Sequence, residues 1–264
     1  MKIGIIGIGF VGAPLAKYLV AAGHQVKVTN TRPPEELARM AQELSATPAT
    51  QQEVAEDVDV LVSSLNFNVL AALPQELKDL FRSLPADVIV ADTGNYIPFR
   101  DGRIEALEQG QVEGMWVAEQ LGRPVTKFLN NLLAETIARG GTPPGTPGRI
   151  ALALAGDDAR AKQVLTTLGN DLGFDAVDAG SLADSWRQQP GTPAYCTELT
   201  APELTKALAL ADKDVSALER ERVFTEIYQL PETERTHKAI VAIERSVLHN
   251  AQQRPGSYAR HHAR

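Results

Sequence analysis

The sequence has a single cysteine, no long apolar run and no signal-peptide pattern, and each of these absences excludes a class of protein. Its 264 residues include one cysteine, Cys196, which excludes an intrachain disulfide and a cysteine-rich metal site. No apolar run approaches the roughly 18 residues that a membrane-spanning helix needs. The chain also begins without the basic lead and cleavage site of a signal peptide. We therefore expect no bound metal, no membrane partner and a cytoplasmic location.

The chain also has fewer basic residues than acidic ones. The chain carries 26 lysines and arginines against 33 acidic residues, a formal net charge of −7. This balance argues against nucleic acid as a partner, because nucleic-acid-binding domains carry a basic excess. The 44% hydrophobic content is sufficient for a packed core in one large or two small domains. These properties are typical of an enzyme with a small-molecule substrate.

A glycine pattern stands at the start of the chain. Residues 7–12 read G-x-G-x-x-G, directly after the apolar residues 3–6 and before an apolar helical pattern. A second strand pattern follows at residues 25–30, so the pattern lies in a βαβ unit of about 30 residues, the context that a dinucleotide site requires. We call residues 7–12 the fingerprint.

Each glycine of the fingerprint has a physical role. Gly7 allows the tight turn out of the first strand, Gly9 lets the backbone approach a pyrophosphate, and Gly12 lets the helix pack closely on the strand. The phosphates are then expected on the helix N-terminus, where free N–H groups and the helix dipole favour anions. The alternative is a tight turn without a ligand.

The end of the second strand indicates which dinucleotide binds. An NAD site usually carries a carboxylate there for the ribose 2′-hydroxyl, whereas an NADP site places arginine near the 2′-phosphate. No carboxylate occurs before Glu35, and Thr31 and Arg32 can both donate hydrogen bonds to a phosphate. The sequence therefore favours NADP, with a solvated loop arginine as the alternative for Arg32.

Strand and helix patterns continue to alternate along the chain, as in a doubly wound sheet. Strand patterns occupy residues 58–65, 87–93 and 124–130, with a helical pattern at 70–84. We therefore expect a Rossmann-type, mostly parallel sheet over residues 1–139. The glycine- and proline-rich residues 140–148 predict a loop, which is either a lid or a plain connection.

The second half of the chain divides into three parts. Residues 149–200 show strand, helix and strand patterns and are expected to form a small α/β extension of the same sheet. Residues 201–250 predict two or three amphipathic helices, which either cover the core or form a dimer interface, and we expect a homodimer. Residues 251–264 are expected to be a disordered tail.

Several short motifs follow one another along the chain in an order that is typical of one protein family. They are G-I-G-F-V-G at 7–12, T-N-T-R at 29–32, V-A-E at 117–119, V-T-K-F-L-N at 125–130, A-G-D-D at 155–158, L-G-F at 172–174 and D-A-G-S-L at 178–182. In this respect, residues 1–200 resemble the coenzyme F-420-dependent NADP oxidoreductase family. The same fold forms the reductase domain of the six-transmembrane metalloreductases.

The resemblance implies a set of cofactor-binding residues. It places the phosphates on Gly7, Gly9, Phe10, Val11 and Gly12, and the 2′-phosphate on Asn30, Thr31 and Arg32. Ser64, Leu65 and Asn66 follow a strand and should border the ribose or nicotinamide. Asn130 matches a position where family members have a polar residue near the nicotinamide, histidine in the deazaflavin enzymes and asparagine in the metalloreductases. It would orient the carboxamide or the acceptor, or else cap the helix that follows.

The implied reaction is hydride transfer between NADPH and a planar acceptor such as F-420 or a flavin. It requires no protein acid or base, because the cofactor carries the chemistry and the protein supplies orientation. Trp186, Arg187 and Tyr195 belong to a proline- and glycine-containing segment, which predicts a loop that walls the acceptor or is anchored on the core. Lys127 is expected at the surface, with an acceptor contact as the alternative.

Two other functions stay open. The start of the chain also looks like β-hydroxyacid dehydrogenases and imine reductases, but residues 180–187, where the dehydrogenases place a catalytic lysine, contain none. Lys127 and Asn131 have the K-x-x-x-N spacing of that site but lie upstream of it. The remaining alternative is a sensor that binds NADP without turnover, because a binding fold does not establish chemistry.

Overall fold

The protein is built around a six-stranded parallel sheet, as seen in a computed structural model that describes residues 1–254. The strand order is β3-β2-β1-β4-β5-β6, and every neighbouring pair is parallel. The strands are β1 (Lys2–Ile6), β2 (Gln25–Thr29), β3 (Thr47–Pro48), β4 (Val60–Ser63), β5 (Ile89–Asp92) and β6 (Thr126–Lys127). This order confirms the predicted doubly wound sheet. Its direction reverses between β1 and β4, which is where such sheets bind ligands.

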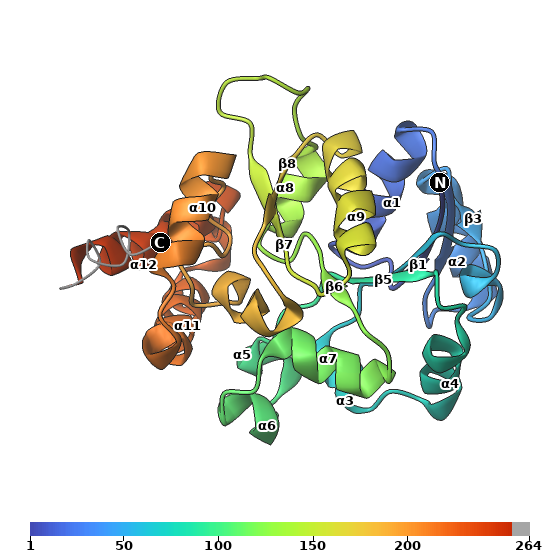
Figure 1. Ribbon diagram of the computed structural model, residues 1–264, viewed down its shortest axis with the longest axis horizontal. Helices are drawn as coiled ribbons and strands as arrows, with labels where there is room; N and C mark the ends of the chain where they lie inside the picture. Colours follow the sequence, from blue (N-terminus) through green and yellow to red (C-terminus); the bar gives the residue numbers. More distant parts are fainter. Residues whose placement is uncertain (255–264) are drawn as a thin grey trace.

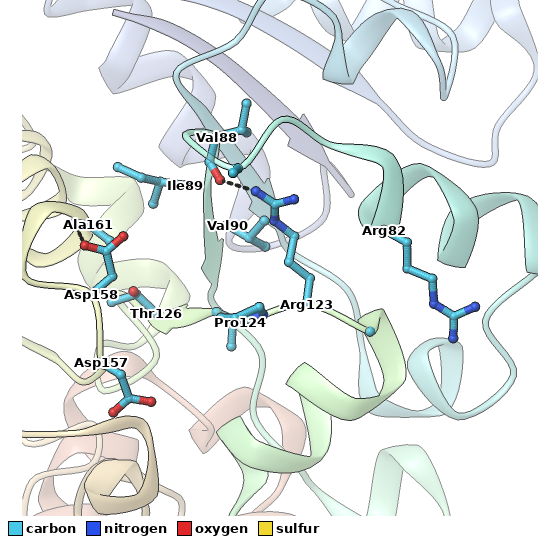
Figure 2. A pocket seen from close by; sticks show the side chains of 13 residues that line it. Arg82, Val88, Ile89, Val90, Arg123, Pro124, Thr126, Asp157, Asp158 and Ala161 are labelled. Atoms are coloured by element: carbon cyan, nitrogen blue, oxygen red, sulfur yellow. Dashed lines mark hydrogen bonds between the residues drawn. The ribbon is translucent and has the colours of Figure 1, made fainter.

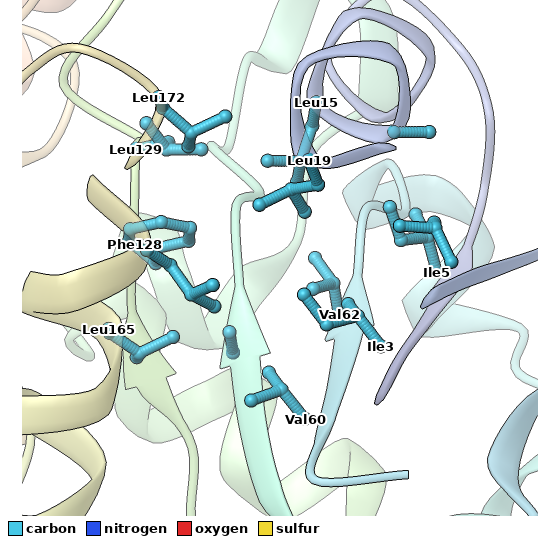
Figure 3. Packing of buried hydrophobic residues seen from close by; sticks show 14 of the residues in the cluster. Ile3, Ile5, Leu15, Leu19, Val60, Val62, Phe128, Leu129, Leu165 and Leu172 are labelled. Atoms are coloured by element: carbon cyan, nitrogen blue, oxygen red, sulfur yellow. The ribbon is translucent and has the colours of Figure 1, made fainter. Parts of the chain in front are cut away.

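Helices cover both faces of this sheet. One face packs against α1 (Gly12–Ala21), α2 (Pro34–Glu43) and α9 (Ala159–Asp171). Figure 3 shows Leu15 and Leu19 of α1 on one side of the cluster, and Leu165 of α9 near Phe128 on the other. The other face packs against α3 (Phe67–Ala71), α4 (Gln75–Ser83) and α7 (Glu113–Leu121). The helix predicted over 70–84 is in fact two, because Pro74 precedes α4 and a proline cannot continue a helix.

The expectation that residues 149–200 extend the same sheet is wrong. Strands β7 (Ala151–Leu154) and β8 (Asp175–Asp178) pair only with each other, in a separate two-stranded sheet. A single antiparallel bridge between Lys127 and Ala155 links β6 to the end of β7. The two faces of β7 are buried in different clusters: Leu152 and Leu154 join the main core, while Ala151 and Ala153 pack under the C-terminal helices.

The C-terminal region is helical, as predicted, and lies on the far side of β7 and β8 from α9 (Figure 1). Its helices are α10 (Ala201–Leu210), α11 (Lys213–Gln229) and α12 (His237–Gln253). Thr200 and Glu203 form a capping box, and Asp212 and Thr236 cap the next two helices. Helix α12 continues to Gln253, so the predicted tail does not begin at 251. Residues 255–264 of that prediction lie outside the described residues.

The remaining short elements are three α-helices and three 3₁₀ helices. They are α5 (Pro98–Asp101), α6 (Glu105–Glu108), α8 (Ala134–Arg139), η1 (Glu53–Ala55), η2 (Leu182–Gln188) and η3 (Glu232–Glu234). The loop at 140–148 is tied at its start to the turn after α9, through Gly141 N to Leu172 O at 3.2 Å and Thr142 N to Gly173 O at 2.9 Å. Within residues 1–254 no helix is both long and apolar enough to cross a membrane.

Lys127 is buried rather than at the surface, where the sequence placed it. Its Nζ lies 2.6 Å from Asp92 Oδ2, both side chains are 0% exposed, and Nζ also donates to the Gly94 carbonyl. The short strand β6 is covered on one side by β5 and on the other by Ala155. The lysine stem runs along α7 at Gly114, where an added Cβ would lie 3.3 Å from Lys127 Cγ.

We expect Lys127→Met to destabilise the protein by about 3–5 kcal/mol, because it leaves the buried Asp92 carboxylate unpaired. Lys162→Met is the matched control, since Lys162 pairs with Asp178 at a site where that aspartate is 62% exposed, and its loss should cost about 1 kcal/mol or less. Urea denaturation measures both. Equal losses for the two variants would contradict this interpretation.

Candidate functional site

A cleft of about 510 Å³ opens at the C-terminal ends of β1, β4 and β5. Its walls come from five parts of the chain: the fingerprint, the turn after β4, the turn after β5, the segment before α8 and the segment before α10. The lining residues are Gly9, Phe10, Val11, Ser64, Leu65, Asn66, Val69, Thr93, Gly94, Asn95, Ile97, Arg100, Leu132, Leu133, Ala134, Tyr195 and Cys196. This is the edge at which parallel α/β sheets bind ligands.

The three fingerprint glycines occupy different environments. Gly7 has a φ of 96°, a conformation that other residues rarely adopt. A Cβ on Gly12 would lie 1.9 Å from the Gly7 carbonyl oxygen, so only glycine allows this helix to begin so close to the turn. A Cβ on Gly9, in contrast, would have no atom within 4 Å. The space at Gly9 is therefore open, and the protein's own packing does not require a glycine there.

The N-terminus of α1 faces the same edge of the sheet. Its N-cap residue, Val11, makes no side-chain hydrogen bond to the helix, and the first turn contains no acidic residue. The first backbone N–H groups of a helix have no partner within the helix, and the dipole favours an anion there. The cleft and this helix terminus together form a cradle suited to a phosphate.

The residues predicted for the 2′-phosphate lie at the end of β2. Asn30 accepts a hydrogen bond from Arg32 N at 3.0 Å, which fixes the turn. Thr31 is exposed, and the Arg32 side chain is 56% exposed and pairs with Glu36. An incoming phosphate can therefore reach Arg32, where it would compete with the Glu36 carboxylate.

Asn130 does not line the cleft. It is 1% exposed, its Nδ2 donates to Asn95 Oδ1 at 3.1 Å and to Gln188 O at 3.0 Å, and its Oδ1 accepts from Gln188 Nε2 at 2.6 Å. It does not cap the following helix either, because the N-cap of α8 is Leu133. The polar side chain that reaches the cleft at this place is Asn95, which the sequence analysis missed. The T-G-N-Y turn directly after a buried strand was the available signal.

The three residues predicted for the acceptor are not brought together. Tyr195 lines the cleft beside Cys196, as the prediction requires. Trp186 lines a separate cavity of about 90 Å³, and the Arg187 guanidinium stacks on its ring at 4.7 Å. Both residues belong to η2, which begins with a capping box between Ser181 and Asp184, so the predicted loop starts only after Gln188.

Cys196 forms part of the cleft wall as a buried residue. It is 1% exposed, and burial raises the pKa of its thiol well above the usual range. A thiol nucleophile needs the opposite shift, so the side chain acts as a small apolar group here. The neighbouring Tyr195 is buried too, and burial raises the pKa of its hydroxyl. The carboxyl of Glu244 on α12 contributes to both shifts.

Glu244 is an isolated acid behind this wall. It is 1% exposed, and its Oε2 has no hydrogen-bond partner among the residues that the structure describes. Burial raises its pKa from the usual 4.5 to about 8, and Arg222 opposes this shift. The side chain is therefore held in its neutral form at neutral pH.

A second cavity, of about 600 Å³, lies at the opposite ends of β5 and β6. Figure 2 shows Arg123 in it with the guanidinium bonded to Val88 O, and Arg123 also donates to the carbonyls of Leu84 and Pro85. Asp158 caps α9. Arg123 and Asp158 thus serve the fold. Within residues 1–254 no group of His, Cys, Asp and Glu could hold a metal ion.

We expect Glu244→Gln to stabilise the protein at pH 8 and to leave it nearly unchanged below pH 4.5. Above pH 4.5 ionisation of this acid lowers the free energy of the unfolded chain, whereas the folded chain does not ionise it until about pH 8. Glutamine removes that difference, which is on the order of 5 kcal/mol. Glu226→Gln, at a side chain that is 52% exposed, is the control. A constant gap between Glu244→Gln and wild type from pH 4.5 to 8 would contradict this.

The N-terminal part of the chain matches known proteins. Residues 2–96, which include the fingerprint and the turns after β2, β4 and β5, match the family model "NADP oxidoreductase coenzyme F420-dependent". The Escherichia coli (strain K12) protein YjhV is 44% identical over 105 residues, which are 40% of this chain and 76% of YjhV.

Two solved structures share the fold. SMa0349 of Sinorhizobium meliloti is 26% identical with a TM-score of 0.63, over 76% of this chain and 95% of that one. A protein of Arthrobacter sp. FB24, provisionally described as an F420-dependent NADP-reductase, is 24% identical with a TM-score of 0.54, over 70% and 87% of the two chains. The family-model match, together with the 44% identity to YjhV, confirms the resemblance drawn from the sequence, and the chain belongs to the coenzyme F420-dependent NADP oxidoreductase family.

Proposed function

We propose that this protein transfers a hydride between NADPH and a planar acceptor such as F-420 or a flavin. The observation that carries the proposal is the cleft, which runs from the fingerprint at Gly9–Val11 to a mostly apolar wall at Tyr195 and Cys196. The fingerprint end of the cleft would take the phosphates of a dinucleotide, and the Tyr195 and Cys196 end would border the acceptor.

The residues present fit NADP. The open space at Gly9 and the N-terminus of α1 would take the pyrophosphate, and Arg32 with Thr31 would take the 2′-phosphate. When bound, NADPH supplies the hydride. The chain's own part is to orient the two reactants and to exclude water, which the buried Tyr195 and Cys196 do on the acceptor side.

The structure disfavours the dehydrogenase alternative, because Lys127 is not placed to act as its general acid. A β-hydroxyacid dehydrogenase would need a lysine at the reacting groups, but the Lys127 ammonium is bound to Asp92 and Gly94, and none of the lysines in residues 1–254 lines the cleft. An imine reductase and a sensor without turnover stay open. The homodimer and the cytoplasmic location stay predictions.

The proposed function is tested by offering the purified protein NADPH with F-420, FMN, riboflavin, ferric chelates and cyclic imines. We expect oxidation of NADPH when a deazaflavin or a flavin is present. The oxidation is measured as the loss of the absorbance of the reduced nicotinamide. Oxidation with cyclic imines alone would identify an imine reductase. Binding of NADPH without oxidation by any acceptor would favour the sensor.

We expect Arg32→Ala to raise the dissociation constant of NADP about tenfold, because the variant loses a charge-assisted hydrogen bond to the 2′-phosphate. The dissociation constant of NAD should stay nearly unchanged. Arg39→Ala is a matched control, because Arg39 lies on α2 and pairs with Glu43 at the same i,i+4 spacing as Arg32 with Glu36. Calorimetric titration measures both ligands. An equal loss for NADP and NAD would refute the assignment of Arg32.

A further inference from the structure

Asn95 stands at the place where two walls of the cleft meet. It follows Gly94 in the turn after β5, and a Cβ on Gly94 would lie 3.1 Å from the Leu65 carbonyl and 3.2 Å from Asp92 Oδ1. The absence of a side chain at Gly94 thus brings the turn after β5 against the turn after β4. Asn95 is half-buried there and lines the cleft with Asn66 and the fingerprint.

The Asn95 amide is held in one orientation by its neighbours. Its Nδ2 donates to Asn130 O at 2.9 Å, and its Oδ1 accepts from Asn130 Nδ2 at 3.1 Å. Its backbone carbonyl accepts from Arg100 Nη2 at 2.7 Å. Asn130 is fixed in turn, because Gln188 both donates to its Oδ1 and accepts from its Nδ2.

This arrangement leaves Asn95 with unused hydrogen-bonding capacity. A side-chain amide has two N–H donors and two acceptor lone pairs, and Asn130 occupies one of each. One donor and one acceptor of this half-buried, cleft-lining residue remain. That combination is complementary to a carboxamide, which also offers both a donor and an acceptor.

The order of the strands indicates which end of the dinucleotide reaches this point. The phosphates belong at the β1–α1 turn, and the 2′-phosphate residues follow β2, on one side of β1. The other half of the dinucleotide must therefore extend over β4 and β5. This path leads from Gly9 past Ser64–Asn66 to Asn95.

We propose that Asn95 binds the carboxamide of the nicotinamide, and that Asn130 and Gln188 are positioning residues that hold Asn95 in the orientation for binding. The inference rests on the proposed NADP site and adds the residue that recognises the reacting end of the cofactor. It also explains why the buried Asn130 amide faces Asn95 rather than the ligand.

The test compares NADP with 2′-phospho-ADP-ribose, which lacks the nicotinamide. We expect Asn95→Ala to raise the dissociation constant of NADP about tenfold and to leave that of the fragment unchanged. Asn68→Ala, at an exposed residue of α3 that does not line the cleft, should alter neither. Asn95→Asp, which keeps the acceptor and loses the donors, serves as a second variant if the alanine variant does not fold.

The positioning role is tested by a double-mutant cycle. Asn130→Ala or Gln188→Met should weaken NADP binding in the wild-type background and have no further effect on it in the Asn95→Ala background. A merely structural role would weaken the binding of NADP and fragment alike in both backgrounds, and would overturn this part.

The outcomes separate the two proposals. If wild-type protein binds neither NADP nor the fragment, the proposed function fails. If it binds both and Asn95→Ala leaves the ratio of the two dissociation constants unchanged, only the role of Asn95 is overturned.

Discussion

The ion pair between Lys127 and Asp92 determines the shape of the cleft wall. The lysine joins the ends of β5 and β6, and the same Asp92 carboxylate accepts a hydrogen bond from Gly94 N at 3.1 Å. The turn that carries Asn95 is thus held by a buried charge and not only by its own backbone preferences. The next residues are held similarly, because the Glu113 carboxylate on α7 accepts from Tyr96 N at 3.1 Å.

A cluster of charges in a core is costly unless each charge has a partner. Burial raises the pKa of Glu113 to about 7, and the nearby Lys127 and Arg220 oppose that shift. Arg220 in turn pairs with Glu108 at 3.0 Å and lies over the Tyr96 ring. Charged groups on α6, α7 and α11 therefore converge on one turn, and we infer that they hold the C-terminal helices in a fixed relation to the sheet.

Much of the fold could be predicted from the sequence, because it depends on local patterns. The fingerprint, the alternation of strand and helix and the helical C-terminal region are all properties of neighbouring residues, and the structure contains them. The errors concern contacts between distant segments. The burial of Lys127 depends on Gly114 and Asp92, and the position of Asn130 behind Asn95 depends on Gln188, 58 residues further along the chain. No spacing within one segment could have indicated either.

The two glycines at positions 9 and 12 illustrate how one motif can satisfy two separate demands. A side chain at Gly12 would collide with the turn at Gly7, whereas a side chain at Gly9 would enter empty space. A mutational scan scored by soluble expression would therefore detect Gly12 and pass over Gly9. A sequence optimised for stability alone would be free to fill position 9, and the resulting protein would be well folded with the open space of the cleft at that position occupied.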